Sequence, residues 1–374
     1  MPRPYLSLVH LYIHVPFCAR RCSYCDFAIA VRRVVPSERF VAAIAGEWAL
    51  RRSHPFGDAT SRVETIYFGG GTPSRLAPEV IGELVELIRS DRETAPDAEI
   101  TLEANPDDVT PEASSAWAAA GVNRVSLGVQ SFDPDVLAWM HRTHHAEQVA
   151  PAMESLRGAG ISNLSLDLIF ALPPELGRDW ARDLDAALAL DPSHLSLYGL
   201  TVEPRTPLGR WTDRGEVSPT AEGAYAEEFL HTTHTLAAAG WDHYEVSNAA
   251  RPGFRSRHNS AYWRRATFIG LGPSAHSGAG SERHWNIREW EAYARAVEAG
   301  RSPIEGSEQL SADAIRMEDL YLGLRTREGA HARWIPASTR EAWIREGWAR
   351  EVGDRLELTP EGWLRLDALV ARVA

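Results

Sequence analysis

The three cysteines of the chain, Cys18, Cys22 and Cys25, all lie in one short segment, FCARRCSYC. Cysteine thiolates hold iron–sulfur clusters, and a cubane cluster has four irons to coordinate. Three thiolates leave one of these irons open to a ligand from outside the protein. The spacing therefore favours a [4Fe–4S] cluster at which a small molecule is bound and reduced.

A structural zinc site is the main alternative for this segment. Zinc would need a fourth ligand, such as His14, and zinc sites usually show paired C-x2-C motifs. Structural cysteines of a core have no reason to gather in one loop, and an odd number of cysteines is unlike an oxidised disulfide framework. The segment therefore indicates an oxygen-sensitive cluster in a reducing compartment.

The composition is that of an ordinary soluble globular protein, with 374 residues of which 44% are hydrophobic and 24% charged. No apolar run is long enough to span a membrane, and the N-terminus lacks a signal-peptide pattern. We therefore expect a cytoplasmic protein, with peripheral membrane contact and a homodimer left open. The net charge of −12 gives no reason to expect nucleic-acid binding. The chain has no lysine, which excludes a P-loop lysine and a lysine Schiff base.

The first two thirds of the chain alternate between strand-like and helix-like segments. Strands are expected at residues 11–17, 65–71, 99–106, 124–132, 164–173 and 194–203. Helices are expected at residues 37–50, 78–89, 111–121, 147–160 and 180–190. Strands separated by helices of this length pair in parallel with right-handed crossovers. Six such units are too few to close a (β/α)8 barrel, so we expect an α/β fold with a partial (β/α)6 TIM-type barrel.

The pattern changes near residue 241, and three parts are predicted. Residues 1–240 form the barrel, and residues 241–309 form an extension that contains HYEVSNAA, RHNSAYW and FIGLGPSAHS. Residues 310–374 form a small winged-helix-like domain, because a short strand precedes the helix start Thr359-Pro360-Glu361. We favour a packing role for this last part, since it carries many acidic residues. A nucleic-acid-binding regulator is the other interpretation.

The residues best suited to chemistry follow the strands, where parallel α/β barrels place their reacting groups. The cysteine segment follows the first strand. Residues 69–72, Gly-Gly-Gly-Thr, end the second strand and offer backbone that can approach a ligand closely, with amides free to bond it. Glu103, Gln130 and Asp167 lie in the next three strands, and Arg142 lies on a following helix. These groups around an open iron would fit an amino-acid nucleoside.

The chain resembles the radical S-adenosylmethionine (SAM) superfamily, in the group of oxygen-independent coproporphyrinogen III oxidases and HemW-type heme chaperones. The resemblance is carried by YIHVPFCARRCSYCDF, GGGTPS, EANP, RVSLGVQSF, DLIFALP, HLSLYGL, YEVSNAA, HNSAYW and GLGPSAHS. It implies that the three cysteines ligate a [4Fe–4S] cluster whose fourth iron chelates SAM. It also implies a SAM site formed by Tyr12, Tyr24, Gly70, Gly71, Thr72, Glu103, Gln130, Arg142, Asp167 and Thr201. Ala171 and Thr201 depart from the glycine and the alanine that the family commonly has.

Three features distinguish the oxidases from the chaperones. Phe27 stands where the oxidases carry a fourth cysteine. The oxidases also have a longer N-terminal segment, whereas this chain starts just before its first expected strand. Residues 258–263, HNSAYW, match the H-N-x-x-Y-W signature of the heme-binding branch and imply a heme site at His258, Asn259, Tyr262 and Trp263. Histidine is a usual axial ligand of heme iron, and aromatic rings suit a flat macrocycle. The structural alternative is that this block only packs beneath the mouth of the barrel.

We therefore expect a heme chaperone that holds a SAM-ligated cluster and delivers heme to acceptor proteins, with respiratory proteins among the candidates. It is expected to lack coproporphyrinogen III dehydrogenase activity. The alternative is an authentic oxidase that decarboxylates coproporphyrinogen oxidatively by radical chemistry in porphyrin biosynthesis.

Overall fold

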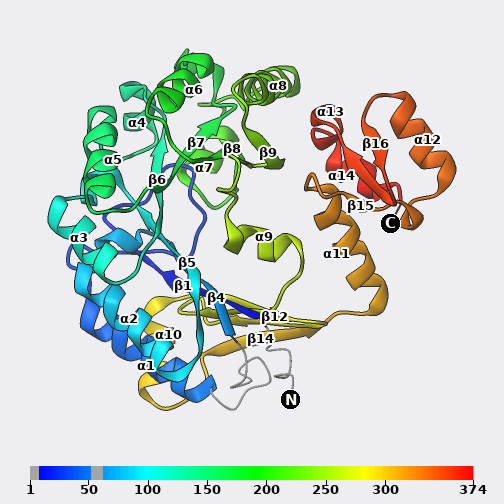
Figure 1. Ribbon diagram of the computed structural model, residues 1–374. Coiled ribbons are helices and arrows are strands. Elements are labelled where there is room, and N and C mark those ends of the chain that lie inside the picture. Colours follow the sequence, from blue (N-terminus) through cyan, green and yellow to red (C-terminus); the bar gives the residue numbers. More distant parts are fainter. Residues whose placement is uncertain (1–7, 52–61, 374) are drawn as a thin grey trace.

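The computed structural model describes residues 8–51 and 62–373, and one twelve-stranded sheet dominates them (Figure 1). The strand order is β14-β13-β12-β11-β1-β4-β5-β6-β7-β8-β10-β9. Its centre is a run of parallel neighbours, namely β1 (Leu8–Val15), β4 (Arg62–Gly70), β5 (Thr94–Ala104), β6 (Arg124–Gln130), β7 (Asn163–Phe170) and β8 (His194–Gly199). The predicted α/β fold with an open, parallel barrel is therefore confirmed.

Helices between the strands cover the outside of the barrel (Figure 1). These are α1 (Ser37–Arg51), α2 (Pro78–Asp91), α3 (Pro111–Ala119), α5 (Val149–Gly158), α6 (Trp180–Ala189) and α8 (Glu222–Ala238). Two shorter helices, α4 (Pro134–Trp139) and α7 (Pro207–Asp213), follow β6 and β8. Single 3-10 turns lie at Pro73–Arg75, Pro106–Asp108, Ala146–Gln148, Pro174–Leu176 and Ala332–Trp334. No helix within the described residues has the length and apolarity needed to cross a membrane.

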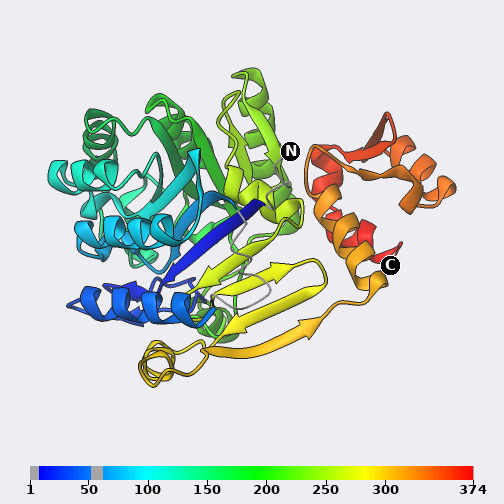
Figure 2. The same ribbon diagram turned by 60° about the horizontal axis from the view of Figure 1, so that its bottom comes forward.

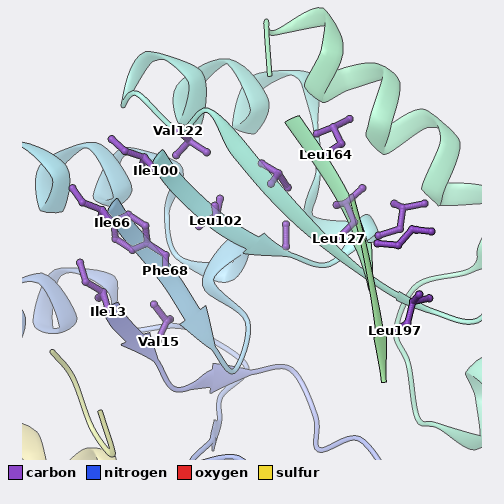
Figure 3. Packing of buried hydrophobic residues seen from close by; sticks show 14 of the residues in the cluster. Ile13, Val15, Ile66, Phe68, Ile100, Leu102, Val122, Leu127, Leu164 and Leu197 are labelled. Atoms are coloured by element: carbon purple, nitrogen blue, oxygen red, sulfur yellow. The ribbon is translucent and has the colours of Figure 1, made fainter. Parts of the chain in front are cut away.

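Side chains alternate along each strand between two environments, as the pleat of a strand requires. Aliphatic residues such as Ile13, Ile66 and Ile100 are buried in the core between strands and helices (Figure 3). Their sequence neighbours lie on the other face, towards the barrel interior, and many are polar. Strand register brings these polar residues to the same level, so that His10 lies opposite Thr65 and Thr65 lies opposite Glu99.

Further strands extend the sheet at both edges. Next to β8 lies β10 (Asn248–Ala250), which is antiparallel to β8. The edge strand β9 (Asp242–Glu245) is in turn antiparallel to β10. Next to β1 lies β11 (Phe268–Leu271), followed by β12 (His276–Ala279), β13 (Glu282–Asn286) and β14 (Ile304–Gln309). Helix α10 (Trp290–Glu298) packs against α1. The predicted extension thus shares the sheet of the barrel, and the boundaries at residues 240 and 309 stay predictions.

Helix α9 (Arg257–Trp263) lies between the barrel strands and the C-terminal segment (Figure 1). The backbone N–H groups of Arg257 and His258 each donate to the carboxylate of Glu99 at 3.0 Å. The Arg257 guanidinium also pairs with Glu64 at 2.6 Å. Contacts to β4 and β5 therefore fix the start of α9, which carries the histidine of the HNSAYW motif.

Helix α11 (Ala312–Leu324) leads from β14 to the C-terminal segment (Figure 2). This segment holds the antiparallel sheet β15 (Ala330–His331), β17 (Arg355–Leu358) and β16 (Ala349–Val352), with helices α12 (Ala337–Arg345), α13 (Pro360–Trp363) and α14 (Leu366–Ala371). The Arg327 N–H donates to the Tyr244 carbonyl at 3.0 Å, and Arg325 pairs with Glu245 at 2.9 Å. These contacts with the β9 edge are in line with a packing role, and the winged-helix likeness stays a prediction.

Candidate functional site

The cysteine loop begins at β2 (Phe17–Cys18) and returns at β3 (Ala30–Val31), and these two short strands pair in parallel. Backbone hydrogen bonds hold the middle of the loop. The Ser23 N–H donates to the Met140 carbonyl at 3.2 Å, and the Ser23 carbonyl accepts from the Leu208 N–H at 2.8 Å. All three cysteines line one cavity of about 400 Å³ at the carboxyl ends of the barrel strands.

The surroundings of the thiols act in two directions. Burial raises the pKa of Cys18, and it raises the pKa of Cys25 to about 11. The Thr72 hydroxyl, whose Oγ1 lies 3.5 Å from Cys18 Sγ, opposes this effect on the pKa of Cys18. Arg142 Nη1 donates to Cys22 Sγ at 3.6 Å. Metals bind the thiolate, so loading a cluster on this site releases protons.

His14 is committed to hydrogen bonds and does not complete a zinc site. Its Nδ1 lies 3.1 Å from Tyr12 Oη, its Nε2 lies 2.9 Å from the Ala28 carbonyl, and burial lowers its pKa to about 4. Within residues 8–51 and 62–373, no three Cys, His, Asp or Glu side chains converge on a point suited to one metal ion. A cubane distributes its thiolates over different irons, so three thiols around one cavity fit its donor set.

The glycine segment after β4 lies directly against the cysteine loop. A Cβ atom at Gly71 would come within 2.8 Å of the Pro16 backbone and 3.0 Å of Cys18 Sγ, so only glycine permits this approach. The expectation of free amides is wrong for two positions. The Gly70 N–H donates to Glu103 Oε2 at 3.0 Å, and the Gly71 N–H donates to the Val15 carbonyl at 2.7 Å.

Two partly buried carboxyl groups, those of Glu103 and Asp167, line the same cavity. Glu103 accepts a hydrogen bond from the Tyr67 hydroxyl at 2.8 Å, and burial raises the pKa of Glu103 to about 7. Asp167 accepts from the Ser126 hydroxyl at 2.8 Å, and burial raises its pKa as well. Glu103, with a pKa of about 7, can therefore take up or release a proton when a charged ligand enters.

The prediction that Arg142 lies on a helix is wrong, because α4 ends at Trp139 and Arg142 follows in a loop. Acceptors on β6 and directly after β5 position its guanidinium. Its Nη2 donates to Asn105 Oδ1 at 2.6 Å and to the Gly128 carbonyl at 2.7 Å. Its Nε is buried and has no hydrogen-bond partner among the described residues. Nearby Gln130 adopts a φ of +69°, a strained backbone conformation of the kind that gathers at functional sites. The guanidinium is therefore held in place at the wall of the cavity, beside the cysteine loop.

The first cavity brings together all the residues predicted for the cluster and SAM except one. Those that line it are Cys18, Cys22, Tyr24, Cys25, Gly70, Gly71, Thr72, Glu103, Gln130, Arg142, Asp167 and Thr201. Tyr12 lies in a second cavity instead, behind Glu103. Ala171 stands where the family commonly has glycine. Its φ of +57° lies in the left-handed region, which glycine adopts more easily than alanine.

The second cavity has a volume of about 250 Å³ and is lined by all four residues predicted to bind heme, His258, Asn259, Tyr262 and Trp263. Its lining residues are Tyr12, Tyr67, Glu103, Tyr198, Asn248, His258, Asn259, Tyr262, Trp263 and Arg325. His258 is 1% exposed, and both ring nitrogens are bonded, Nδ1 to Thr65 Oγ1 at 2.6 Å and Nε2 to Tyr262 Oη at 2.9 Å. Burial lowers the pKa of His258 well below its usual range.

Glu103 and Tyr198 line both cavities, so these two side chains form the wall between them. Tyr198 was not predicted as a site residue, and neither was Tyr67, whose ring stacks on His258 at a centroid distance of 4.9 Å. A signal was available, because Tyr67 and Tyr198 alternate with aliphatic residues on strands that carry other site residues. Asn105 and Arg325 gave no such signal, since their roles depend on contacts between distant segments.

Comparisons with known proteins agree with this geometry. The model of the Radical SAM superfamily matches residues 12–187. The heme chaperone HemW of Mycobacterium tuberculosis is 40% identical over 366 residues, which cover 96% of this chain and 93% of that protein. HemW of Synechocystis sp. is 35% identical, with 89% and 82% covered. The solved structure of the coproporphyrinogen III oxidase HemN from Escherichia coli matches with a TM-score of 0.82 at 21% identity, covering 100% of this chain and 91% of that one, which shows the shared fold.

Proposed function

The chain belongs to the HemW family of radical SAM proteins, and we propose that it is a heme chaperone that binds heme and delivers it to acceptor proteins. One observation carries this proposal. The similarity to HemW extends over 93% of the relative's length at 40% identity, so it includes the segments outside the radical SAM core. One of those segments holds the HNSAYW motif at residues 258–263, which lines a cavity of its own.

The proposal includes a [4Fe–4S] cluster on the three cysteines, with SAM beside it in the first cavity. When bound, the cluster supplies an electron that can cleave the sulfonium C–S bond of SAM. The protein's part is to hold SAM and to balance its charge. Carbonyls of the glycine segment and the Thr72 hydroxyl suit the SAM ammonium group, because the two glycine amides are already bonded. Arg142 suits the SAM carboxylate, since its positively charged guanidinium lines the same cavity.

The SAM roles of Tyr24, Gln130, Asp167 and Thr201 stay predictions that rest on their places in the same cavity. A SAM role for Tyr12 has no support from its position in the second cavity. The cytoplasmic location, respiratory acceptors and a homodimer also stay part of the proposal.

Heme binding at His258 requires the second cavity to open. Its volume of about 250 Å³ lies below the roughly 300–1,000 Å³ of pockets that enclose drug-sized ligands. The Nε2 atom that would bind iron is occupied by the Tyr262 hydroxyl at 2.9 Å. Breaking one such hydrogen bond costs only about 1 kcal/mol, which an iron–imidazole bond readily offsets. The arrangement in which Tyr262 is bonded to His258 Nε2 is therefore a closed form of the proposed site.

The test is an anaerobic heme titration of the cluster-reconstituted protein, read by absorbance and followed by gel filtration. We expect saturable heme that stays with the wild type and is largely lost from His258→Ala. The matched control is His231→Ala, which removes an exposed histidine of α8 outside both cavities and should bind heme like the wild type.

An authentic oxidase is the second candidate, favoured by the fold shared with HemN at a TM-score of 0.82. Phe27 stands where such oxidases carry a fourth cysteine, which argues against it. If the wild type retains no heme, the chaperone proposal fails. Formation of protoporphyrinogen IX from coproporphyrinogen III, with SAM and a reductant under anaerobic conditions, would then support the oxidase.

A further inference from the structure

His258 takes part in a chain of hydrogen bonds that begins at His10. Thr65 Oγ1 lies 3.0 Å from His10 Nδ1 and 2.6 Å from His258 Nδ1. Thr65 is fully buried, so its hydroxyl has these two rings as its neighbours instead of bulk water. On the far side of the His258 ring, Nε2 lies 2.9 Å from Tyr262 Oη.

The single proton of the Thr65 hydroxyl decides which tautomer His258 adopts. If Thr65 donates to His10, it accepts the Nδ1–H of His258, and Nε2 keeps its lone pair. If Thr65 donates to His258, the proton of His258 is on Nε2, and that atom cannot bind a metal. His10 is only half-buried, so its Nε2 can carry the proton towards water and leave Nδ1 to accept from Thr65.

We propose that Thr65 is the positioning residue for heme coordination, because it accepts the Nδ1–H of His258 and so fixes the tautomer whose Nε2 binds iron. This inference rests on the proposed function. In the heme-bound protein, His258 Nε2 would hold the iron instead of the Tyr262 hydroxyl, and Nδ1 would keep its hydrogen bond to Thr65. Histidines that bind metals commonly donate their second ring N–H to such an acceptor, and loss of the acceptor typically lowers metal affinity by about 10- to 100-fold.

Strand register explains why Thr65 can do this. It lies opposite His10 on β1 and opposite Glu99 on β5. Glu99 accepts the backbone N–H of His258 at 3.0 Å, while Thr65 contacts the side chain of the same residue. One level of the barrel therefore fixes both the backbone and the ring of His258, and the Tyr262 hydroxyl is the group bonded to its Nε2.

The first test measures the tautomer directly and needs no heme. Long-range 1H–15N correlation spectra of heme-free protein labelled with 15N-histidine distinguish a proton on Nδ1 from one on Nε2. The His258→Ala spectrum identifies the signal. We expect Nδ1–H in the wild type and in Thr65→Ser. A proton on Nε2 in the wild type would overturn the inference, whatever the protein does with heme.

The second test compares Thr65→Val, which keeps the shape and removes the hydroxyl, with Thr65→Ser, which restores it. We expect heme affinity to fall about 10- to 100-fold in Thr65→Val and to stay within about threefold of the wild type in Thr65→Ser. The reduction potential of residual bound heme should also shift in Thr65→Val. Equal melting temperatures of the two variants show that folding is not the cause.

Wild-type affinity and an unshifted potential in Thr65→Val would contradict the role of Thr65 and leave the chaperone proposal standing. Failure of the wild type to retain any heme would contradict the chaperone proposal. The tautomer spectrum would still test whether Thr65 accepts the Nδ1–H of His258. The two failures are therefore distinguishable.

Discussion

The two cavities of the barrel share a wall but use their polar groups differently. The first cavity, of about 400 Å³, is lined by the positive charge of Arg142 and by two partly buried carboxyl groups with raised pKa values, Glu103 and Asp167. In the second, of about 250 Å³, His258 has hydrogen bonds on both sides of its ring. The first cavity is thus prepared for a charged ligand, whereas the second must exchange an internal contact for its ligand.

This difference indicates two kinds of binding. A ligand of the first cavity gains from electrostatic interactions that are already in place, and its affinity should depend on charge and pH. A ligand of the second cavity must first displace the Tyr262 hydroxyl from His258, so its affinity should depend on hydrogen-bond geometry and on movement. Substitutions that affect one cavity alone, or both together, can therefore test whether the cavities are separate.

The largest effect is expected for Cys22→Ser, which removes one of the three thiolates. Serine is a poor ligand for iron–sulfur clusters, so anaerobic reconstitution should give almost no bound iron instead of about four irons per chain. Iron and sulfide analysis, with visible absorbance, measures the loss. If the cavities are separate, heme affinity should stay within about threefold of the wild type, because no bond of the His258 network is broken.

The matched control for this substitution is Ala19→Ser, which adds the same side chain to the same loop and keeps all thiols. It should retain a full cluster. Loss of heme binding together with the cluster in Cys22→Ser would show that the second cavity depends on the first.

A smaller effect is expected for Glu103→Gln, which keeps the shape of the cavity wall and removes a charge. SAM carries a sulfonium and an ammonium group, so an ionised Glu103 stabilises it, and we expect SAM affinity to fall about 30-fold at pH 8. The pKa of Glu103 is about 7, so its ionised fraction falls as the pH drops through 7. Wild-type SAM affinity should therefore weaken below pH 7, while that of Glu103→Gln changes less.

Calorimetric titration with SAM between pH 6 and pH 8 measures this dependence under anaerobic conditions. Glu93→Gln, a charge-neutralising substitution outside both cavities, serves as the control and should follow the wild type. Identical pH profiles of the wild type and Glu103→Gln would show that the charge of Glu103 does not act on SAM.

The cluster cavity could be predicted largely from the sequence, because its residues lie at the ends of periodic strands. The cysteine spacing, the glycine segment and Glu103 all appear as local patterns, and the barrel brings them to one edge. The prediction of free amides at Gly70 and Gly71 was wrong, because their hydrogen-bond partners lie on other strands and cannot be read from a local pattern. Glu103 and the Val15 carbonyl take up these amides once β1, β4 and β5 are in register.

The second cavity could be predicted only in part. The HNSAYW motif identified His258, but Tyr12, Thr65 and Tyr67 become its neighbours only through the register of β1 and β4. Arg325 arrives from α11, more than sixty residues after the motif, through contacts at the β9 edge. Long-range register and the docking of distant segments are therefore what sequence patterns leave open.

The smallest but most discriminating effect is expected for Gly69→Ala, because Gly69 lies beside the shared wall. A Cβ atom there would come within 2.8 Å of Tyr67, 2.9 Å of Tyr12 and 3.0 Å of Glu103 Oε1. Crowding of this kind typically costs about 1–3 kcal/mol and displaces the side chains involved. We expect both SAM and heme affinities to fall about three- to tenfold, as measured by the two titrations.

Gly223→Ala on α8 is the control, since an added Cβ meets nothing within 4 Å and both affinities should stay unchanged. If SAM and heme affinities both fall in Gly69→Ala, while only SAM affinity falls in Glu103→Gln, a displaced wall affects both cavities and the charge of Glu103 affects only the first. Loss of SAM affinity alone in Gly69→Ala would mean that the second cavity accommodates the shift of Tyr12 and Tyr67. The side chains around His258 would then be able to move more than their hydrogen bonds suggest, because a shift of the aromatic neighbours would leave iron coordination intact.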